Sequence, residues 1–346
     1  MLKKILATQI ALASFGYASA QDSTKKTAPL VISGSVDAYY RYSFEDSKAA
    51  DFNNKTSFTK SQNSYELGMA TVKLDHTVGK VSATADLGFG RRAAEFSYND
   101  GGSLASVKQL FVSYAASDKV KLTLGKWATH VGYELVDAIG NRNYSMSYMF
   151  SYGPFFHTGL KADVGLGGKS AFMVGITNPT DQSTTTSSTK MVIAQFSTGT
   201  KNDKLKAYLN YQGGSTPNVK VNQFDLVLLG TISPKFSINY DGSLYSVKSG
   251  GTTNSWFGSA LYFNYDPTDK FGLTVRGEYF DDKKTVAGIG SDVLAFTVSG
   301  NIKLGPLTVI PELRLDNASK VAIFEKNNGN PTKTAATAIL AAVYRF

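Results

Sequence analysis

Charged side chains recur at alternate positions along much of this 346-residue chain. Between Leu30 and Phe44 the even positions are mostly apolar or aromatic, whereas the odd positions carry serines, Asp37 and Arg41. Successive side chains of a β-strand point to opposite faces, so such a strand has one oily face and one polar face. Acidic and basic groups on facing walls of a wet interior would set a field that acts on dissolved ions. The first chemistry that the pattern predicts is therefore passage of small solutes, with no covalent step.

The same alternation predicts a set of charged residues of both signs on the polar face. Taken singly, each is explained as well by a solvated or ion-paired side chain, so the prediction concerns the set. The predicted lining residues are Asp37, Arg41, Asp86, Lys121, Lys161, Asp163, Lys206, Asp225, Lys235, Asp241, Arg276, Glu278, Glu312, Arg314 and Arg345.

A hydrolase would instead need a nucleophile and a base within hydrogen-bond reach. The chain has no cysteine and only three histidines. His130 and His157 flank a stretch with Ser145, Ser147 and Asp137, but this spacing matches no catalytic motif, and no Gly-x-Ser-x-Gly sequence occurs. Two separated histidines are a weak metal site, and no basic stretch is interleaved with stacking aromatics for nucleic acid. We expect no enzyme activity, no metal or other cofactor, and no nucleic-acid partner.

About sixteen runs follow the period of two, which predicts an all-β chain. One of them, residues 62–75, changes register near Met69 and Ala70, which suggests a bulge. The predicted runs are 30–44, 62–75, 79–90, 105–115, 119–126, 157–166, 169–178, 188–197, 203–212, 219–229, 234–241, 254–264, 269–280, 291–303, 306–316 and 335–346.

The connections between these runs alternate in length. Residues 45–61 form a long polar connection, a tight turn around His76 follows, and the alternation continues to a long connection at 317–334. Outer-membrane barrels have an even strand number, short periplasmic turns and long outer loops, and closure leaves no unpaired strand edge in hydrocarbon. We therefore predict one domain, residues 30–346: a transmembrane antiparallel up-and-down β-barrel of about 16 strands. A secreted β-sandwich is the alternative.

Both ends of the chain predict an outer-membrane location. Residues 1–20 have a positive start, an apolar stretch and a final Ala-Ser-Ala, as in a cleavable signal peptide. Its removal would lower the net charge from +9 to +7 and leave residues 21–29 as a flexible lead-in. At the other end, Tyr344 and the terminal Phe346 resemble the signal by which the barrel-assembly machinery recognises its clients.

One long connection, residues 127–156, is richer in apolar and aromatic residues than the others. Loops exposed to water rarely carry so many apolar side chains, so we expect this one to fold into the barrel. Lys126, Glu134, Asp137 and Arg142 are the candidates to reach a constriction there. The alternatives are a plug, a cap over the mouth, or part of a subunit interface.

Sequence motifs in this region resemble a known family. They are Gly132-Tyr133-Glu134, Asn141-x-Asn143-Tyr144-Ser145, Ser147-Tyr148, and Gly153-Pro154-Phe155-Phe156-His157-Thr158-Gly159. They resemble the putative β-barrel porin-2 (OmpL-like) family, which is common in Bacteroidota, and the resemblance covers about residues 30–346. It implies an outer-membrane pore and identifies neither a substrate nor individual functional residues.

These features predict a porin for passive diffusion of small hydrophilic solutes and ions, and a sequence pI near 9.3 favours a weak anion preference. The alternatives are a plugged adhesin-type or structural barrel, and a sugar channel in which Tyr208, Trp256 and Tyr262 stack on sugar rings. Expected partners are outer-membrane lipids and lipopolysaccharide, which residues 53–60 and 320–333 could touch. A homotrimer is considered because general porins are often trimers, although no residue marks a trimer face.

Overall fold

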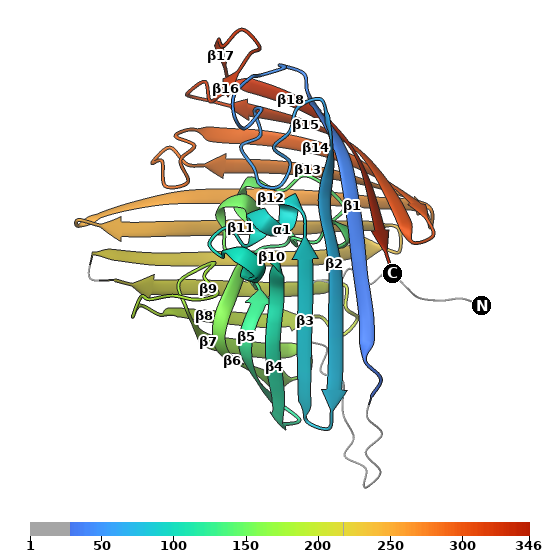
Figure 1. Cartoon of the computed structure of the whole chain (residues 1–346), viewed down its shortest axis with the longest axis vertical. Coiled ribbons are helices and arrows are strands. Elements are labelled where there is room, and N and C mark those ends of the chain that lie inside the picture. The colour runs from blue at the N-terminus through green and yellow to red at the C-terminus, as the bar shows by residue number, and fades with distance from the viewer. Residues whose placement is uncertain (1–27, 217) are drawn as a thin grey trace.

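The chain forms a closed barrel. The structure is a computed structural model that describes residues 28–216 and 218–346. Sixteen antiparallel strands form the wall, and each pairs with its neighbours along the chain. The first, β1 (Val31–Ser43), closes the barrel against the last, β18 (Thr334–Arg345) (Figure 1). The predicted all-β barrel is thus confirmed, whereas the predicted signal peptide and residues 21–27 of the lead-in lie outside the described residues.

Each predicted run corresponds to one wall strand. The other wall strands are β2 (Ser64–Val78), β3 (Val81–Phe89), β4 (Val107–Ser117), β5 (Val120–Ala128), β6 (Phe156–Gly167), β7 (Ser170–Thr177), β8 (Met191–Gly199), β9 (Leu205–Ser215), β10 (Val219–Ser233), β11 (Phe236–Ser249), β12 (Thr252–Thr268), β13 (Phe271–Asp281), β14 (Asp292–Leu304) and β15 (Leu307–Ala318). Outside the wall lie α1 (Arg91–Phe96), α2 (Tyr148–Tyr152), the short 3-10 helices η1 (Gly102–Ser106) and η2 (Ala138–Gly140), and the hairpin β16 (Phe324–Glu325) and β17 (Pro331–Thr332). Across the described part of the chain, every helix is too short or too polar to cross a membrane.

The alternation of side chains gives the wall its two faces. On β1, Asp37, Tyr39 and Arg41 point inward and are buried, whereas Val36 and Ala38 point outward and are exposed. The outward face of the other strands is likewise rich in leucine, valine, isoleucine, phenylalanine and tyrosine. Because hydrocarbon offers no hydrogen bonds, an apolar outer face on a closed sheet is the arrangement that suits a membrane.

A bulge in β2 is where the sequence pattern changes register. The pairing of β1 with β2 shifts between Val36 and Ala38, opposite Gly68 and Met69, which confirms the predicted irregularity. Both Gly68 and Met69 are buried. A Cβ atom at Gly68 would collide with the Asp37 carboxylate and the Tyr144 hydroxyl. The bulge and the glycine together make room for an inward contact of β1 with the interior.

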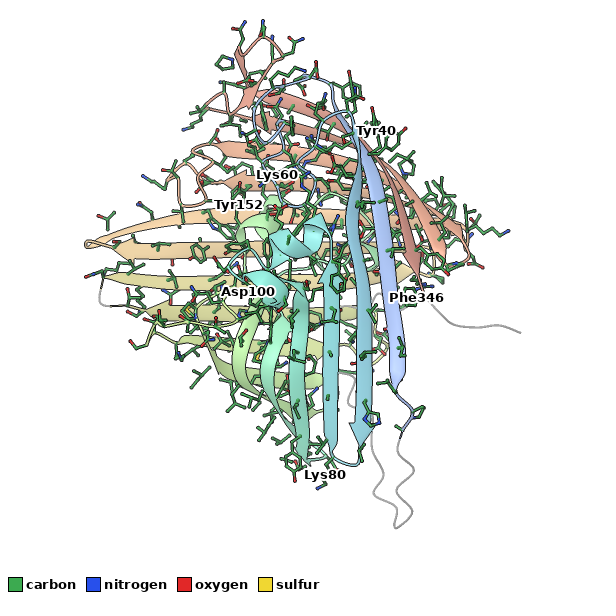
Figure 2. All side chains as sticks on the ribbon, viewed as in Figure 1. Tyr40, Lys60, Lys80, Asp100, Tyr152 and Phe346 are labelled. Atoms are coloured by element: carbon green, nitrogen blue, oxygen red, sulfur yellow. The ribbon has the colours of Figure 1, made fainter. Side chains whose placement is uncertain are left out.

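The predicted alternation of loop lengths fails at the outer end of β11 and β12. The sequence predicts a connection at 242–253, but both strands continue and are joined at Gly250 and Gly251, whose φ angles are 56° and 82°. Glycine adopts this left-handed backbone without the steric cost of a Cβ. The sequence there resembles a loop because it is rich in glycine and serine, and because the outward positions of β11 beyond Leu244 are the polar Ser246 and Lys248. Similarly, His76 lies in β2, and the turn falls at Gly79 and Lys80 (Figure 2).

The two-faced wall predicts how a charge on its outer face acts. Leu313 lies mid-strand in β15 and points outward, between inward-facing Glu312 and Arg314. Leu313→Lys should destabilise the membrane-inserted barrel by about 2–4 kcal/mol, because the ammonium group would face hydrocarbon. Urea titration of folding into lipid vesicles measures this cost. Val321→Lys, at an exposed site in the 319–333 connection, is the control, and equal effects of both variants would contradict the assigned faces.

Candidate functional site

The connection between β5 and β6, residues 129–155, lies inside the barrel. We call it the inner segment; it contains η2 and α2. Its residues 143–150 are all buried. They make hydrogen bonds to inward side chains of β1, β13, β14 and β15. In Figure 2, Tyr152 at the end of α2 projects within the outline of the wall. The inner segment therefore occupies space that would otherwise be open lumen.

Wall carboxylates bind successive backbone amides of the inner segment. Glu312 on β15 accepts the N–H groups of Tyr144 at 2.7 Å and Ser145 at 3.0 Å. Glu278 on β13 accepts those of Tyr148 at 2.6 Å and Met149 at 3.3 Å. Consecutive N–H groups that converge on one anion form a strong, oriented, charge-assisted contact. Each carboxylate thereby anchors one turn of the inner segment to the wall.

A second pair of carboxylates holds the start of the inner segment. Asp225 on β10 accepts the N–H of Gly132 at 3.0 Å, and Asp241 on β11 accepts that of Tyr133 at 3.1 Å. Gly132 has a φ of 89°, which glycine adopts without strain. Asn210 on β9 also donates to Asp225, at 2.7 Å. Gly132 and Tyr133 are thus bound to two neighbouring strands, and a third strand supports one of the two carboxylates.

Two arginines bind the carbonyl side of the same segment. Arg276 on β13 lies 2.6 Å from the Glu134 carboxylate and donates to the Ser145 carbonyl at 2.8 Å. Arg314 on β15 donates to the Met146 carbonyl at 2.7 Å and forms an ion pair with Asp316 at 2.7 Å. These groups are almost fully buried, so each charge depends on its partner for the solvation that it has lost.

Further contacts extend this network to both sides of the barrel. The Tyr144 hydroxyl donates to Asp37 on β1 at 2.5 Å. The Arg142 guanidinium donates two hydrogen bonds to the Asp266 carboxylate in a bidentate contact, at 2.7 and 3.1 Å. Asp137 lies 2.6 Å from Lys108, which also contacts Asp86. The inner segment is therefore tied to opposite walls and spans the lumen between them.

The structure brings most of the predicted lining charges together inside the barrel. Instead of facing open water, they bind the inner segment and the first outer loop. Arg41 binds the Phe52 and Ser61 carbonyls of the first outer loop. Those in direct contact with the inner segment are Asp37, Asp225, Asp241, Arg276, Glu278, Glu312 and Arg314. Asp86 joins them through Lys108. Of the loop candidates, Glu134, Asp137 and Arg142 lie on the inner segment.

The remaining candidates lie elsewhere. Lys121, Lys161, Asp163 and Lys206 are on the inward face of β5, β6 and β9, away from these contacts. Lys126 belongs to β5 rather than to the connection, and it binds Asp100 at 2.9 Å. Lys235 was placed on the wall, but it is exposed in the turn between β10 and β11, because the strand begins only at Phe236. Arg345 keeps the inward register but is exposed at the end of β18.

Several residues of the site had no signal in the sequence. Asp181, in the 178–190 connection, accepts the N–H groups of Phe155 at 2.7 Å and Phe156 at 2.9 Å and fixes the end of the inner segment. Lys108 points inward only because the β3–β4 register shifts beside Asp86. Arg92 of α1 is buried against the Tyr144 ring. The alternation of strand side chains does not predict the orientation of residues in loops or at bulges.

The first outer loop, residues 44–63, covers the inner segment from the mouth. Phe58 is buried against the rings of Phe150 and Phe155, at centroid distances of 6.2 and 5.3 Å. The Tyr152 hydroxyl donates to the Lys55 carbonyl at 2.7 Å. The inner segment and this loop together form a packed layer on the outer side of the lumen.

The serine–histidine–aspartate set drawn from the sequence is not assembled. His130 Nε2 binds the Tyr211 carbonyl at 3.1 Å, and His157 Nε2 lies 3.3 Å from the Thr129 hydroxyl. Asp137 is bound to Lys108 instead of to an imidazole. In residues 28–216 and 218–346, no group of three or more histidine and carboxylate side chains is arranged to hold a metal ion.

Comparisons with known proteins agree with this architecture. The sequence model of the family described as "Putative beta-barrel porin-2, OmpL-like" matches residues 29–346. Curated proteins give no match. At these low identities the likeness to solved structures shows the fold, which is that of outer-membrane porins. Three of them are the outer membrane channel DcaP of Acinetobacter baumannii (12% identity, 95% of this chain and 100% of that chain, TM-score 0.63), an anion-selective porin from Comamonas acidovorans (12%, 92% and 99%, 0.63), and a loop-L8 deletion mutant of OmpT, an outer membrane protein of Vibrio cholerae (11%, 92% and 99%, 0.64).

The buried Arg276–Glu134 pair predicts what holds the inner segment in place. Arg276→Gln would leave the Glu134 carboxylate buried with its main countercharge gone, at a cost of about 3–5 kcal/mol. The segment should loosen while the wall persists, so limited proteolysis of the refolded barrel should produce new cuts within residues 129–155. Lys283→Gln, which removes a half-exposed ion pair with Asp281, is the control. Cleavage identical to wild type would show that Arg276 does not hold the segment.

Asp181 predicts a pH dependence. Burial raises its pKa to about 7, although the N–H groups of Phe156 and Phe155 oppose this shift. The folded protein then binds the proton more tightly than the unfolded chain, so Asp181 stabilises the fold most at low pH, and the contribution is lost as pH rises through about 7. Relative to Asp181→Asn, wild-type unfolding free energy should fall by up to about 1.4 kcal/mol per pH unit from about pH 4 to about pH 7. Urea titrations at several pH values test this. Asp118→Asn, in an exposed turn, should keep the wild-type profile, and an unchanged profile in Asp181→Asn would refute the assignment.

Proposed function

The chain belongs to the putative β-barrel porin-2 (OmpL-like) family, and from this premise we propose that it forms a narrow channel for passive diffusion of small hydrophilic solutes and ions, with a weak anion preference. Family and fold place the protein in the outer membrane and indicate a channel without enzymatic chemistry. A closed 16-strand barrel is wide enough for an aqueous lumen. The observation that carries the narrow passage is the inner segment, bound to opposite walls through Asp37, Asp241 and Glu312.

The preference for anions rests on which charges remain accessible. The carboxylates of Asp225, Asp241, Glu278 and Glu312 are buried and accept backbone N–H groups, so they offer little to a passing cation. The Lys161 side chain on β6 is 18% exposed. Its ammonium group lies 3.4 Å from the Asp163 carboxylate, a long ion pair that neutralises its charge only in part. Lys121 on β5 pairs in register with Asp163 and is half-buried. Two lysines beside one carboxylate leave a small positive excess, which attracts anions weakly. The Comamonas acidovorans porin, described as anion-selective, has the same fold.

The second candidate function is a plugged barrel with a structural or adhesive role. It is favoured by the burial of Phe58 under the mouth and of Arg276 and Glu278 within the lumen, each at most 1% exposed. A sugar channel has less support. Trp256 and Tyr262 do face inward, but Trp256 stacks on Tyr245 and Tyr262 packs on Tyr133. Those ring faces are already occupied by protein.

Tyr344 and Phe346, which we propose as the assembly signal, point toward the membrane. Tyr344 and Phe346 are both exposed. The backbone of Phe346 exchanges two hydrogen bonds with Gly34, at 3.0 and 3.1 Å, so it belongs to the closing seam. Exposed aromatic rings at the seam are accessible to assembly machinery. A homotrimer remains a proposal that no residue of the wall supports specifically.

Recordings in planar lipid bilayers test both whether the protein conducts ions and whether Lys121 and Lys161 cause its anion preference. The refolded protein should give ohmic single-channel conductance, and its reversal potential in a salt gradient should show a slight anion preference. The double variant Lys121→Gln, Lys161→Gln should shift that potential toward cations, because the lumen loses its positive excess.

Lys201→Gln with Lys235→Gln removes the same charge from exposed periplasmic turns and should leave the potential unchanged. Almost no conductance in the wild type would favour the plugged barrel. Strong cation selectivity would overturn the charge argument.

A further inference from the structure

The outer rim of the barrel carries two lysines that face each other across a strand pair. Lys220 on β10 lies directly opposite Lys248 on β11. Directly opposed residues of an antiparallel pair have Cβ atoms about 5 Å apart, and like charges at this spacing destabilise the sheet. Both residues are exposed. A pair of ammonium groups at this spacing is a site where an anion would relieve repulsion.

The two lysines project from the membrane side of the wall. On β10, Gln223 and Asp225 point inward and are buried, so Phe224 and Lys220 share the outward face. On β11, Ser243 is buried and Leu244 is exposed, which places Lys248 on the outward face as well. Lys220 lies four residues, about 13 Å along the strand, beyond Phe224 of the apolar band. The outward face of β10 is apolar from Ile232 to Phe224 and polar beyond, at Asn222 and Lys220, which is the order expected where hydrocarbon gives way to lipid headgroups.

The position along the barrel selects the outer leaflet. Lys220 and Lys248 lie near the turns that join β9 to β10 and β11 to β12. These turns are at the same end as the first outer loop and the attachment points of the inner segment, and opposite to the chain termini. The lipid in contact with the pair therefore belongs to the outer leaflet of the outer membrane.

The immediate surroundings are hydroxyl-rich. A shallow hollow between the two hairpin tips is lined by both lysines and by residues that include Ser215, Thr216, Ser249 and Gly251. None of the described residues that line it is acidic. Ammonium and hydroxyl groups together match a phosphate, whose oxygens accept from both.

We propose that Lys220 and Lys248 bind a phosphate on the headgroup of an outer-leaflet lipid. The proposal rests on the outer-membrane location and the strand register, and it does not depend on conduction through the lumen. The pair would fix the barrel's height and rotation relative to its nearest lipids, because the phosphate is held on one strand pair of sixteen.

The test uses the full-length barrel refolded in detergent and three probes: bisphosphorylated lipid A, its dephosphorylated form, and inorganic phosphate. Binding is measured by native mass spectrometry over a concentration series. Lys220→Gln with Lys248→Gln should weaken binding of bisphosphorylated lipid A about 30-fold, with each single variant intermediate. Lys201→Gln with Lys235→Gln, the same charge change at the periplasmic rim, should bind as wild type does.

Three outcomes would overturn the proposal. They are equal binding by the double variant and wild type, equal binding of the dephosphorylated lipid, and binding of inorganic phosphate as tight as that of the lipid. Single-channel conductance of the double variant should equal that of wild type, which also verifies folding. A wild type that binds the lipid but does not conduct would reject the proposed channel and leave this site intact.

Discussion

The structure depends on the bond between inward carboxylates of the wall and backbone amides of the segment that crosses the lumen. A closed sheet uses its own N–H and C=O groups in its ladder, so it has none left for a chain folded inside it. Buried amides nevertheless require acceptors. Glu278 and Glu312 supply them, while Arg276 and Arg314 bind carbonyls of the same stretch. The charged face of the barrel therefore acts first as a scaffold for its own interior, and only the unused charges can meet a solute.

This role explains why the alternation is so regular on β13 and β15. Apolar residues that face the membrane alternate with acidic and basic residues that face the interior. A shift of the strand register by one residue would therefore turn the apolar side chains inward and the charged ones toward the lipid. The bulge at Gly68 and Met69 departs from this regular register and permits a specific contact. It brings Asp37 to the Tyr144 hydroxyl, and only glycine leaves the room that this contact needs. Register, lipid contact and the position of the inner segment are therefore determined by the same residues.

The strands and the inward charges can be predicted from the sequence because both follow from a period of two. The aromatic content of residues 127–156 likewise indicates the segment that folds inside. Other features of the site depend on tertiary contacts that no local pattern carries. At the outer ends of β11 and β12 the outward face becomes polar beyond Leu244, so residues 242–253 resemble a loop although most of them are hydrogen-bonded strand. Asp181 and Lys108 enter the site through a loop and a register shift, and neither is encoded in a local pattern. Whether Glu312 faced water or a backbone amide could not be known without the path of the segment.

The seam between β1 and β18 has a consequence for biosynthesis. β1 is the first wall strand to be synthesised, and its second neighbour is the last wall strand, β18, where Phe346 bonds to Gly34. A chain cut short by even one strand would be a curved sheet with two bare edges, unable to seal itself against lipid. The closed topology therefore selects for full-length chains. A truncated chain has no stable form in the bilayer, so it remains accessible to periplasmic proteases.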